Sequence, residues 1–181
     1  MVSFHGEPEP LRDADDMAYG CLFCITGREE RIVQRIAESC PLVHAVTMRK
    51  MKYRTSHGQK RTEEALLLPS YVFFTAPTDT DPFQALPKTD VIRILLSNDG
   101  EWQLQGEDLR FAKWLFQYDG LLDFSKAHRE GDRIRIISGP LKDMEGKITR
   151  IDKRGRSGQV MVEFQGRTIP IWLSFELIDP I

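Results

Sequence analysis

The stretch that decides the fold is GDRIRIISGPLKDMEGKITRID, residues 131–152. Its two apolar runs, RIRII and KITRI, have strand-like lengths and are separated by Ser, Gly and Pro, which predicts two β-strands joined by a tight turn. Gly139 permits a backbone φ that other residues avoid, and Gly146 is expected to let the returning strand begin without a clashing Cβ. Two further short runs, GQVMVEF and TIPIWL, follow at close intervals. Residues 129–181 are therefore expected to form a small all-β barrel.

Residues 131–152 resemble a KOW motif, which consists of a strand, a Ser-Gly-Pro turn, a second glycine and a returning strand. One departure is that Asp143 stands where the family usually has glycine. KOW motifs are shared by ribosomal proteins and other RNA-associated barrels. The motif therefore implies an SH3-like barrel linked to nucleic acid, and the rest of the chain must narrow the function.

The chain upstream of residue 123 predicts alternating strands and helices. YGCLFCI, at 19–25, is a short aromatic and apolar run that ends at Thr26, as a strand before a turn does. Thr26 is expected to cap the next helix, because Glu29 stands three residues later in a capping-box arrangement. That helix is expected to end before Pro41.

Two further strand regions follow: LVHAVTMRKMKYR at 42–54, and EEALLLPSYVFFT at 63–75, which Pro69 interrupts. Gly58 lies between them and predicts the tip of a β-hairpin. Helix starts near residues 82 and 107, together with the strand-like run VIRILL, complete the pattern. We therefore expect an α+β fold, in which a four-stranded antiparallel sheet with flanking helices precedes the small barrel.

Changes of pattern divide the chain into four expected parts. Residues 1–16 hold five acidic residues, one arginine and no apolar run, which predicts an acidic, disordered tail and not a secretory signal. Residues 17–122 are expected to form the sheet-and-helix domain. The hydrophobic periodicity lapses at 123–128, which we interpret as a linker to the barrel at 129–181.

The order of these elements resembles the NusG family, in which an NGN domain precedes a KOW domain. The resemblance covers nearly the whole chain: a strand, a TGREE helix, a basic hairpin, the strand LPSYVFF, further helices, a linker and the KOW barrel. The chain departs from the family at Tyr19 and Gly20, where Trp-Tyr is common, and at Leu68 and Ser70, which replace an aromatic residue and a glycine. With the acidic tail, these departures resemble the specialised LoaP-like or RfaH-like antiterminators more than the general factor.

The resemblance implies a transcription elongation or antitermination factor and not an enzyme. In this family the NGN domain binds the clamp helices of RNA polymerase through an apolar patch, bridges the cleft around the nucleic acid and suppresses pausing. The corresponding residues here are Tyr19, Leu68, Pro69, Tyr71 and Phe73. The alternative interpretation is that each of them belongs to the ordinary core of the sheet. Strand alternation makes at least one of Phe73 and Phe74 a core residue.

A basic segment, 49–61, holds six lysine and arginine residues and no acid, interleaved with Tyr53. Clustered cations beside an aromatic ring suit contact with nucleic-acid phosphates, whereas a solvated hairpin is the simpler interpretation. The resemblance implies contact with upstream or non-template DNA. The candidate contact residues are Arg49, Lys52, Arg54, His57, Lys60 and Arg61.

A second basic cluster lies in the expected barrel, within residues 147–156, where Asp152 is the single acid. RNA phosphates or an acidic protein surface would suit it, and arginine favours RNA because it forks onto phosphates and stacks on bases. A polar loop that keeps the barrel soluble is the alternative. In the NusG family this domain recruits a ribosomal protein, the termination factor Rho or RNA. The cluster consists of Lys147, Arg150, Lys153, Arg154 and Arg156.

Several other classes of protein are disfavoured. Cys21 and Cys24 form a C-x-x-C, but no second ligand pair follows and a strand sends the two side chains to opposite faces, so we expect buried thiols and no metal or cofactor. Catalytic motifs are not found. No apolar run approaches the ~20 residues of a membrane helix, so a cytoplasmic protein is expected. We also expect it to be a monomer. The alternative function is a ribosome-associated KOW-type RNA-binding protein, which would leave the LPSYVFF patch without a purpose beyond the core.

Overall fold

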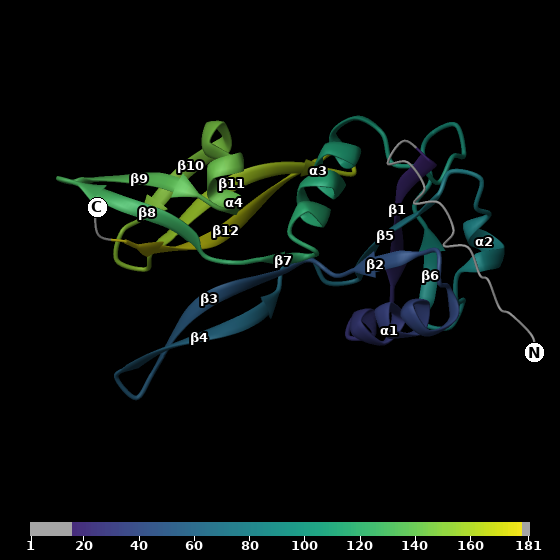
Figure 1. Cartoon of the computed structure of the whole chain (residues 1–181), viewed down its shortest axis with the longest axis horizontal. Coiled ribbons are helices and arrows are strands. Elements are labelled where there is room, and N and C mark those ends of the chain that lie inside the picture. The colour runs from purple at the N-terminus through teal and green to yellow at the C-terminus, as the bar shows by residue number, and fades with distance from the viewer. Residues whose placement is uncertain (1–15, 179–181) are drawn as a thin grey trace, which may run out of the picture.

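The structure is a computed structural model that describes residues 16–178 (Figure 1). The predicted acidic tail lies outside the described residues, apart from Asp16. The expected four-stranded antiparallel sheet is present, in the order β2-β5-β1-β6. Its strands are β1 (Met17–Cys24), β2 (His44–Val46), β5 (Tyr71–Pro77) and β6 (Val91–Ile94). The helices beside it are α1 (Glu29–Ser39), α2 (Pro82–Ala85) and α3 (Gly106–Gln117).

Both faces of this sheet are covered, because β1 and β5 carry apolar side chains on both sides. Phe74 packs in a cluster with Ile32 of α1, whereas Cys21 and Phe73 belong to a second cluster that includes residues of α3. The prediction that at least one of Phe73 and Phe74 is core is confirmed, and in fact both are fully buried. Cys24 lies in the cluster of Phe74, so the two thiols face opposite sides, as the strand period predicted.

The start of α1 differs from the predicted capping box. The residue before the helix gives no side-chain cap, and the hydroxyl of Thr26 is instead hydrogen-bonded to that of Ser70 at 2.5 Å. The carboxylate of Glu29 is 3% exposed and accepts the Ser70 N–H at 2.7 Å. Ser70 has a φ of 73°, which glycine adopts most easily. Thr26 and Glu29 therefore hold a serine in a backbone conformation that favours glycine.

Replacing Glu29 with alanine is expected to lower the free energy of unfolding by about 1–3 kcal/mol, because the Ser70 N–H would lose its acceptor inside the protein. Glu38→Ala is the matched control, since Glu38 is an exposed residue of the same helix and should change stability by less than about 0.5 kcal/mol. Urea denaturation of both variants and the wild type measures the difference. Equal stability of the three proteins would show that the Glu29–Ser70 hydrogen bond does not stabilise this turn.

The basic segment forms a separate hairpin. β3 (Arg49–Ser56) pairs with β4 (Gln59–Leu66), and β7 (Leu121–Leu122) adds to β3 to complete a three-stranded sheet. The two turn residues, His57 and Gly58, have φ values of 50° and 74°, as a two-residue hairpin turn requires. The predicted hairpin tip at Gly58 is confirmed. The hairpin projects away from the four-stranded sheet and runs beside the C-terminal strands (Figure 1).

The C-terminal part forms a five-stranded sheet, in the order β10-β11-β12-β8-β9, which fits the expected all-β unit. Residues 125–128, which the sequence assigned to the linker, belong instead to β8, because they pair with β9 and with β12. We call this unit the barrel. Its strands are β8 (Ser125–Glu130), β9 (Arg133–Ser138), β10 (Ile148–Asp152), β11 (Ser157–Phe164) and β12 (Arg167–Leu177).

The connection from β9 to β10 is helical, where the sequence predicted a simple turn. It contains α4 (Pro140–Asp143) and a 3-10 turn (Glu145–Lys147). Gly139 has a φ of 94°, and a Cβ there would come within 2.8 Å of the β8 backbone, so glycine is required. The predicted close approach at Gly146 is wrong, because a Cβ built there meets nothing within 4 Å.

The barrel and the four-stranded sheet share one hydrophobic cluster. Phe164 ends β11, and its ring centroid lies 5.3 Å from those of Phe73 on β5 and Phe111 on α3. Figure 1 shows α3 between the four-stranded sheet and the barrel. The barrel is therefore docked on the sheet face opposite α1.

Candidate functional site

The five apolar residues predicted to bind a partner lie close together. Tyr19 of β1 shares a sheet face with Tyr71 and Phe73 of β5, because β1 and β5 pair with Tyr19 opposite Thr75 and Cys21 opposite Phe73. Leu68 and Pro69 lie in the connection that leads into β5. We call this set the β5 surface: Tyr19, Leu68, Pro69, Tyr71 and Phe73.

The barrel covers much of the β5 surface in this structure. Phe73 is 0% exposed, and the ring of Tyr71 lies 5.4 Å from that of Phe164 in an edge-on contact. Tyr19 packs edge-on against Phe116 of α3 at 5.4 Å. Tyr19, Leu68 and Tyr71 are half-buried, and Pro69 is exposed. We call this arrangement, with the barrel docked on the sheet, the closed arrangement. Phe73 belongs to the core in it, so the β5 surface is largely unavailable to a partner.

Polar contacts surround the aromatic cluster where the barrel meets α3. Asp108 of α3 accepts the backbone N–H of Gln165 at 2.8 Å and its side-chain amide at 2.6 Å. The hydroxyl of Tyr118 donates to Asp143, and burial, followed by this bond, raises the pKa of Tyr118. Each such bond contributes on the order of 1 kcal/mol. The buried rings around Phe164 should therefore contribute most of the free energy that holds the barrel on the four-stranded sheet.

A further contact joins the hairpin to the barrel. The ammonium group of Lys50 donates to the backbone carbonyl of Trp172 on β12. Burial, followed by the charge of Lys52, lowers the pKa of Lys50. Beside it, the rings of Tyr53 and Phe124 lie 4.6 Å apart. The hairpin is therefore positioned by the barrel as well as by its own sheet.

Three of the six predicted nucleic-acid contacts on the hairpin are paired with carboxylates. Arg49 pairs with Glu64. Glu63 lies 3.1 Å from both Lys52 and Arg54, and hydrogen bonds from these two cations lower the pKa of the Glu63 carboxyl. Sequence reasoning missed these pairs, although the hairpin register places Lys52 opposite Glu63.

The other three predicted contacts, His57, Lys60 and Arg61, lie at the exposed hairpin tip. The ammonium group of Lys60 is 3.9 Å from the ring centroid of Tyr53, a cation–π contact. Arg61 donates to the side chain of Gln59 at 3.3 Å. Within residues 16–178, neither Lys60 nor Arg61 forms an ion pair with a carboxylate. The tip therefore carries exposed cations that no carboxylate of the described residues neutralises.

The basic cluster of the barrel is divided between the two ends of β10. Lys147 precedes the strand, and its ammonium group lies 3.9 Å from the carboxylate of Glu107 on α3. Arg150 is exposed within β10. Lys153 and Arg154 are exposed on the turn to β11. The predicted cluster therefore extends from the residue before β10 to the turn after it.

The turn between β10 and β11 carries three of the five cations of the predicted barrel cluster, Lys153, Arg154 and Arg156. Asp152 orders this turn by accepting the Gly155 N–H at 2.9 Å. Burial, followed by the charge of Arg156, lowers the pKa of Lys60. We use the name basic surface for the cations of the hairpin tip and of this turn: Lys60, Arg61, Lys153, Arg154 and Arg156.

The C-x-x-C pair lies in environments that favour the neutral thiol. Burial raises the pKa of Cys21, and burial, followed by the charges of Glu29 and Asp90, raises that of Cys24 to about 11. A metal ligand or redox nucleophile needs the thiolate. Residues 16–178 contain no group of three or more His, Cys, Asp or Glu side chains placed to hold a metal ion. In the same range, no helix combines the length and the apolar character needed to cross a membrane.

Comparisons with known proteins give consistent results. A family model described as KOW motif matches residues 130–163. Two relatives are named transcription termination/antitermination protein NusG. The one from Borreliella burgdorferi is 38% identical over 136 residues, which cover 69% of this chain and 73% of the relative. The one from Thermus thermophilus is 40% identical over 52 residues, which cover 29% of this chain and 28% of the relative.

A solved structure described as "Domain interaction in Thermotoga maritima NusG" is also similar. It covers 87% of this chain and 93% of its own, with a TM-score of 0.49 and 19% sequence identity.

Proposed function

Because this chain belongs to the NusG family and is a NusG-like transcription factor, we propose that it binds RNA polymerase and suppresses pausing or termination. The observation that carries the proposal is the β5 surface, where aromatic and aliphatic side chains of adjacent strands gather on one sheet face. We assign an NGN domain to residues 17–122. We assign the KOW domain to the barrel, with its start moved from residue 129 to residue 125 because β8 belongs to it.

The β5 surface has the chemistry that a helical hairpin such as the polymerase clamp helices requires. Tyr19 and Tyr71 each offer a large apolar ring with a polar end, the type of residue that anchors protein interfaces. Leu68 and Pro69 extend the surface at the edge that is partly exposed in the closed arrangement. Since Phe73 is buried beneath the barrel, polymerase binding requires the barrel to move away. Barrel docking and polymerase binding therefore compete for the same residues.

The basic surface supplies the nucleic-acid contacts in this proposal. On the hairpin, Lys60 and Arg61 meet phosphates of upstream or non-template DNA, and His57 lies in the turn that precedes them. On the barrel, Lys153 and Arg154 suit nascent RNA or an acidic protein such as a ribosomal protein or Rho. Arg49, Lys52 and Arg54 contribute less, because each is already paired with a carboxylate.

Replacing both Lys60 and Arg61 with alanine is expected to reduce the salt dependence of single-strand binding. Losing two phosphate contacts should lower the slope of log K against log salt by about 1.4. Fluorescence anisotropy of a labelled oligonucleotide over a KCl series measures this slope. The matched control replaces Arg31 and Lys113, two exposed cations elsewhere on the chain, with alanine. If both double variants lower the slope equally, the contacts are not localised at the hairpin tip.

The departures from the family pattern support a specialised factor of the LoaP-like or RfaH-like kind. Gly20 replaces a large side chain, and a Cβ there would meet the ring of Phe74 at 2.3 Å. Ser70 replaces glycine and depends on Thr26 and Glu29 for its hydrogen bonds. These substitutions reshape the sheet beside the β5 surface, which is where a changed polymerase contact would arise.

The second candidate function is ribosome-associated RNA binding, which the KOW motif and the basic surface favour. The two functions are separated by incubating the full-length chain with purified RNA polymerase and with purified ribosomes. We expect it to be retained on immobilised polymerase, and to sediment with ribosomes only at low salt, where electrostatic contacts are weakly screened. Sedimentation that persists at physiological salt, without retention on polymerase, would place the ribosomal function first.

A further inference from the structure

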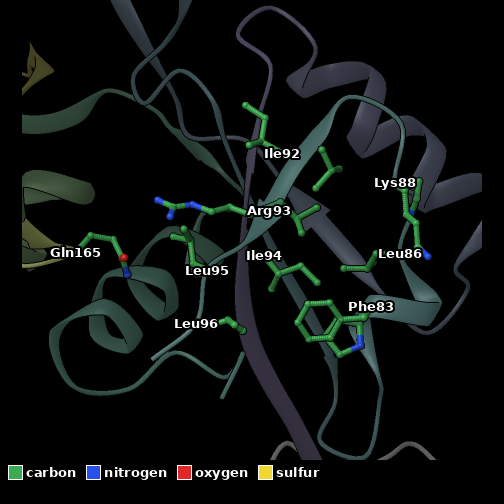
Figure 2. Close-up of a pocket in the computed structure, with 13 residues that line it drawn as sticks. Phe83, Leu86, Lys88, Ile92, Arg93, Ile94, Leu95, Leu96 and Gln165 are labelled. Atoms are coloured by element: carbon green, nitrogen blue, oxygen red, sulfur yellow. The ribbon is translucent and has the colours of Figure 1, made fainter. Parts of the chain in front are cut away.

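An apolar groove of about 610 Å³ lies beside β6, the strand at one end of the four-stranded sheet (Figure 2). Figure 2 shows Leu86 and Ile94 in its middle part, between Lys88 on one side and Arg93 on the other. Sites that enclose a bound molecule typically have volumes of roughly 300–1,000 Å³. The groove is therefore large enough for several side chains of a partner. Its principal apolar lining residues are Leu22, Phe83, Leu86, Ile92, Ile94 and Leu96.

The groove leaves large apolar side chains in contact with solvent. Phe83 is 51% exposed, Ile92 is 58% exposed and Leu96 is 47% exposed. A single exposed apolar residue is ordinary, whereas several at one place with charged residues beside them are typical of an interaction site. The groove therefore has the composition of a binding surface.

The groove carries positive charge. Lys88 and Arg93 are its only charged lining residues within residues 16–178, and both are exposed. Neither forms an ion pair with a carboxylate of this range, and the acid that precedes β6, Asp90, is already paired with Arg35 at 3.3 Å. The guanidinium of Arg93 lies 5.5 Å from the centroid of the Phe23 ring, a cation–π contact. An occupant that supplies carboxylates beside apolar side chains is therefore favoured.

The edge of β6 is poorly suited to the addition of a strand. The strand has four residues, and its pairing with β1 shifts register between Phe23 and Cys24. Irregular pairing and charged side chains at a sheet edge both oppose strand addition. The occupant must therefore be held by its side chains. A helix satisfies its own backbone hydrogen bonds and presents apolar side chains at positions i, i+3, i+4 and i+7, so it is suited to an apolar groove.

Two other occupants fit less well. Two copies of this chain that met groove to groove in a symmetric dimer would bring two sets of Lys88 and Arg93 together, and like charges disfavour such a contact. An anionic membrane would attract these cations, but membrane-binding faces insert exposed apolar side chains into the lipid. Leu86 is buried and Ile94 is half-buried within the groove, so a flat lipid surface would leave this part of it unfilled.

We propose that the groove beside β6 binds an amphipathic helix of a partner protein, whose apolar face packs on Phe83, Ile92 and Ile94 while its carboxylates pair with Lys88 and Arg93. The groove shares no residue with the β5 surface. A partner helix therefore binds here without competing for the residues assigned to polymerase. The inference does not depend on the proposed polymerase role, and it gives the chain a second protein-binding surface.

The test selects helical peptides from a displayed library that bind the full-length chain, after removal of those that also bind the Ile92→Asp chain. Ile92 is exposed, so this substitution should leave the fold intact, which circular dichroism checks. We expect the selected peptides to carry apolar residues at helical spacing with acidic residues beside them. If no peptide is retained, or if the retained peptides lack acidic residues, the proposal is overturned.

A charge exchange tests the pairing with the two cations. A synthetic peptide from the selection is titrated against the wild-type chain and the Lys88→Glu, Arg93→Glu double variant. We expect the double variant to bind it about tenfold more weakly, and to bind more tightly a peptide in which lysine replaces the acidic residues. The matched control is Arg31→Glu with Lys113→Glu, two exposed cations outside the groove, which should change the Kd by about twofold or less. Equal losses in the two double variants would reveal a general charge effect and contradict the proposal.

Two further measurements address the other occupants. Analytical ultracentrifugation of the chain alone should give the same mass for the wild type and Ile92→Asp. Sedimentation with phosphatidylglycerol vesicles should likewise not depend on Ile92. Self-association that Ile92→Asp abolishes would assign the groove to a second copy of the chain, and vesicle binding that it abolishes would assign the groove to a membrane. Either result would overturn the proposal.

Discussion

Replacing Phe164 with alanine is expected to strengthen the binding of the full-length chain to RNA polymerase by about tenfold or more. Phe164 is 2% exposed, and its ring contacts those of Tyr71, Phe73 and Phe111. Removing a buried phenylalanine side chain costs about 3–5 kcal/mol. If only about 1.4 kcal/mol of this loss weakens docking, the population of the open form rises tenfold, and the apparent affinity for polymerase rises with it.

The control for this prediction is Ile136→Ala. Ile136 lies in β9, is 4% exposed and should cost a similar amount of barrel stability without removing a ring from the docking cluster. Equilibrium binding to purified polymerase, with circular dichroism to check folding, separates the two effects. Equal strengthening by both variants would attribute the gain to barrel unfolding and not to the Phe164 contacts.

Replacing both Leu68 and Tyr71 with alanine in the Phe164→Ala chain is expected to weaken polymerase binding by roughly a hundredfold. Anchor residues in interfaces each contribute about 2 kcal/mol or more, and their effects are not additive, so a joint loss near 2.8 kcal/mol is the expected scale. The Phe164→Ala background matters because Tyr71 also contacts Phe164. In the wild-type chain, loss of Tyr71 would also weaken docking of the barrel. Weaker docking favours polymerase binding, so it would mask part of the loss of affinity.

Leu42→Ala in the same background is the matched control, since Leu42 is a largely exposed apolar residue outside the β5 surface. It should leave the affinity within about twofold of the Phe164→Ala chain, as expected for a surface substitution outside the interface. If the Leu68→Ala, Tyr71→Ala pair folds normally and binds polymerase as tightly as this control, the β5 surface is not the polymerase interface.

Much of the fold follows from local patterns. The strand at 19–25, the Gly58 hairpin and the KOW motif depend on period, turn chemistry and glycine placement, and each is seen at close to its predicted position. The predicted capping box does not form, because the carboxylate of Glu29 accepts a hydrogen bond from the backbone N–H of Ser70, which is distant in sequence. The predicted linker extends too far toward the C-terminus. Ser125 and the residues after it belong to β8, because they pair with β12 near the end of the chain.

The candidate site was less predictable than the fold. The clustering of Tyr19, Tyr71 and Phe73 follows from strand alternation and pairing. Their burial does not follow from these local patterns, because it depends on contacts of Tyr71 and Phe73 with Phe164, which comes from the C-terminal part of the chain. Long-range arrangement likewise places Lys50 against the barrel, because its ammonium group donates to the backbone carbonyl of Trp172.

The most direct test of the central claim is a titration of purified RNA polymerase with three labelled full-length chains: wild type, Phe164→Ala, and Phe164→Ala combined with Leu68→Ala and Tyr71→Ala. The account predicts measurable binding by the wild type, tighter binding by Phe164→Ala and severe loss in the triple variant. If neither the wild type nor the folded Phe164→Ala chain binds polymerase, the claim that this protein acts by binding polymerase through its β5 surface is contradicted.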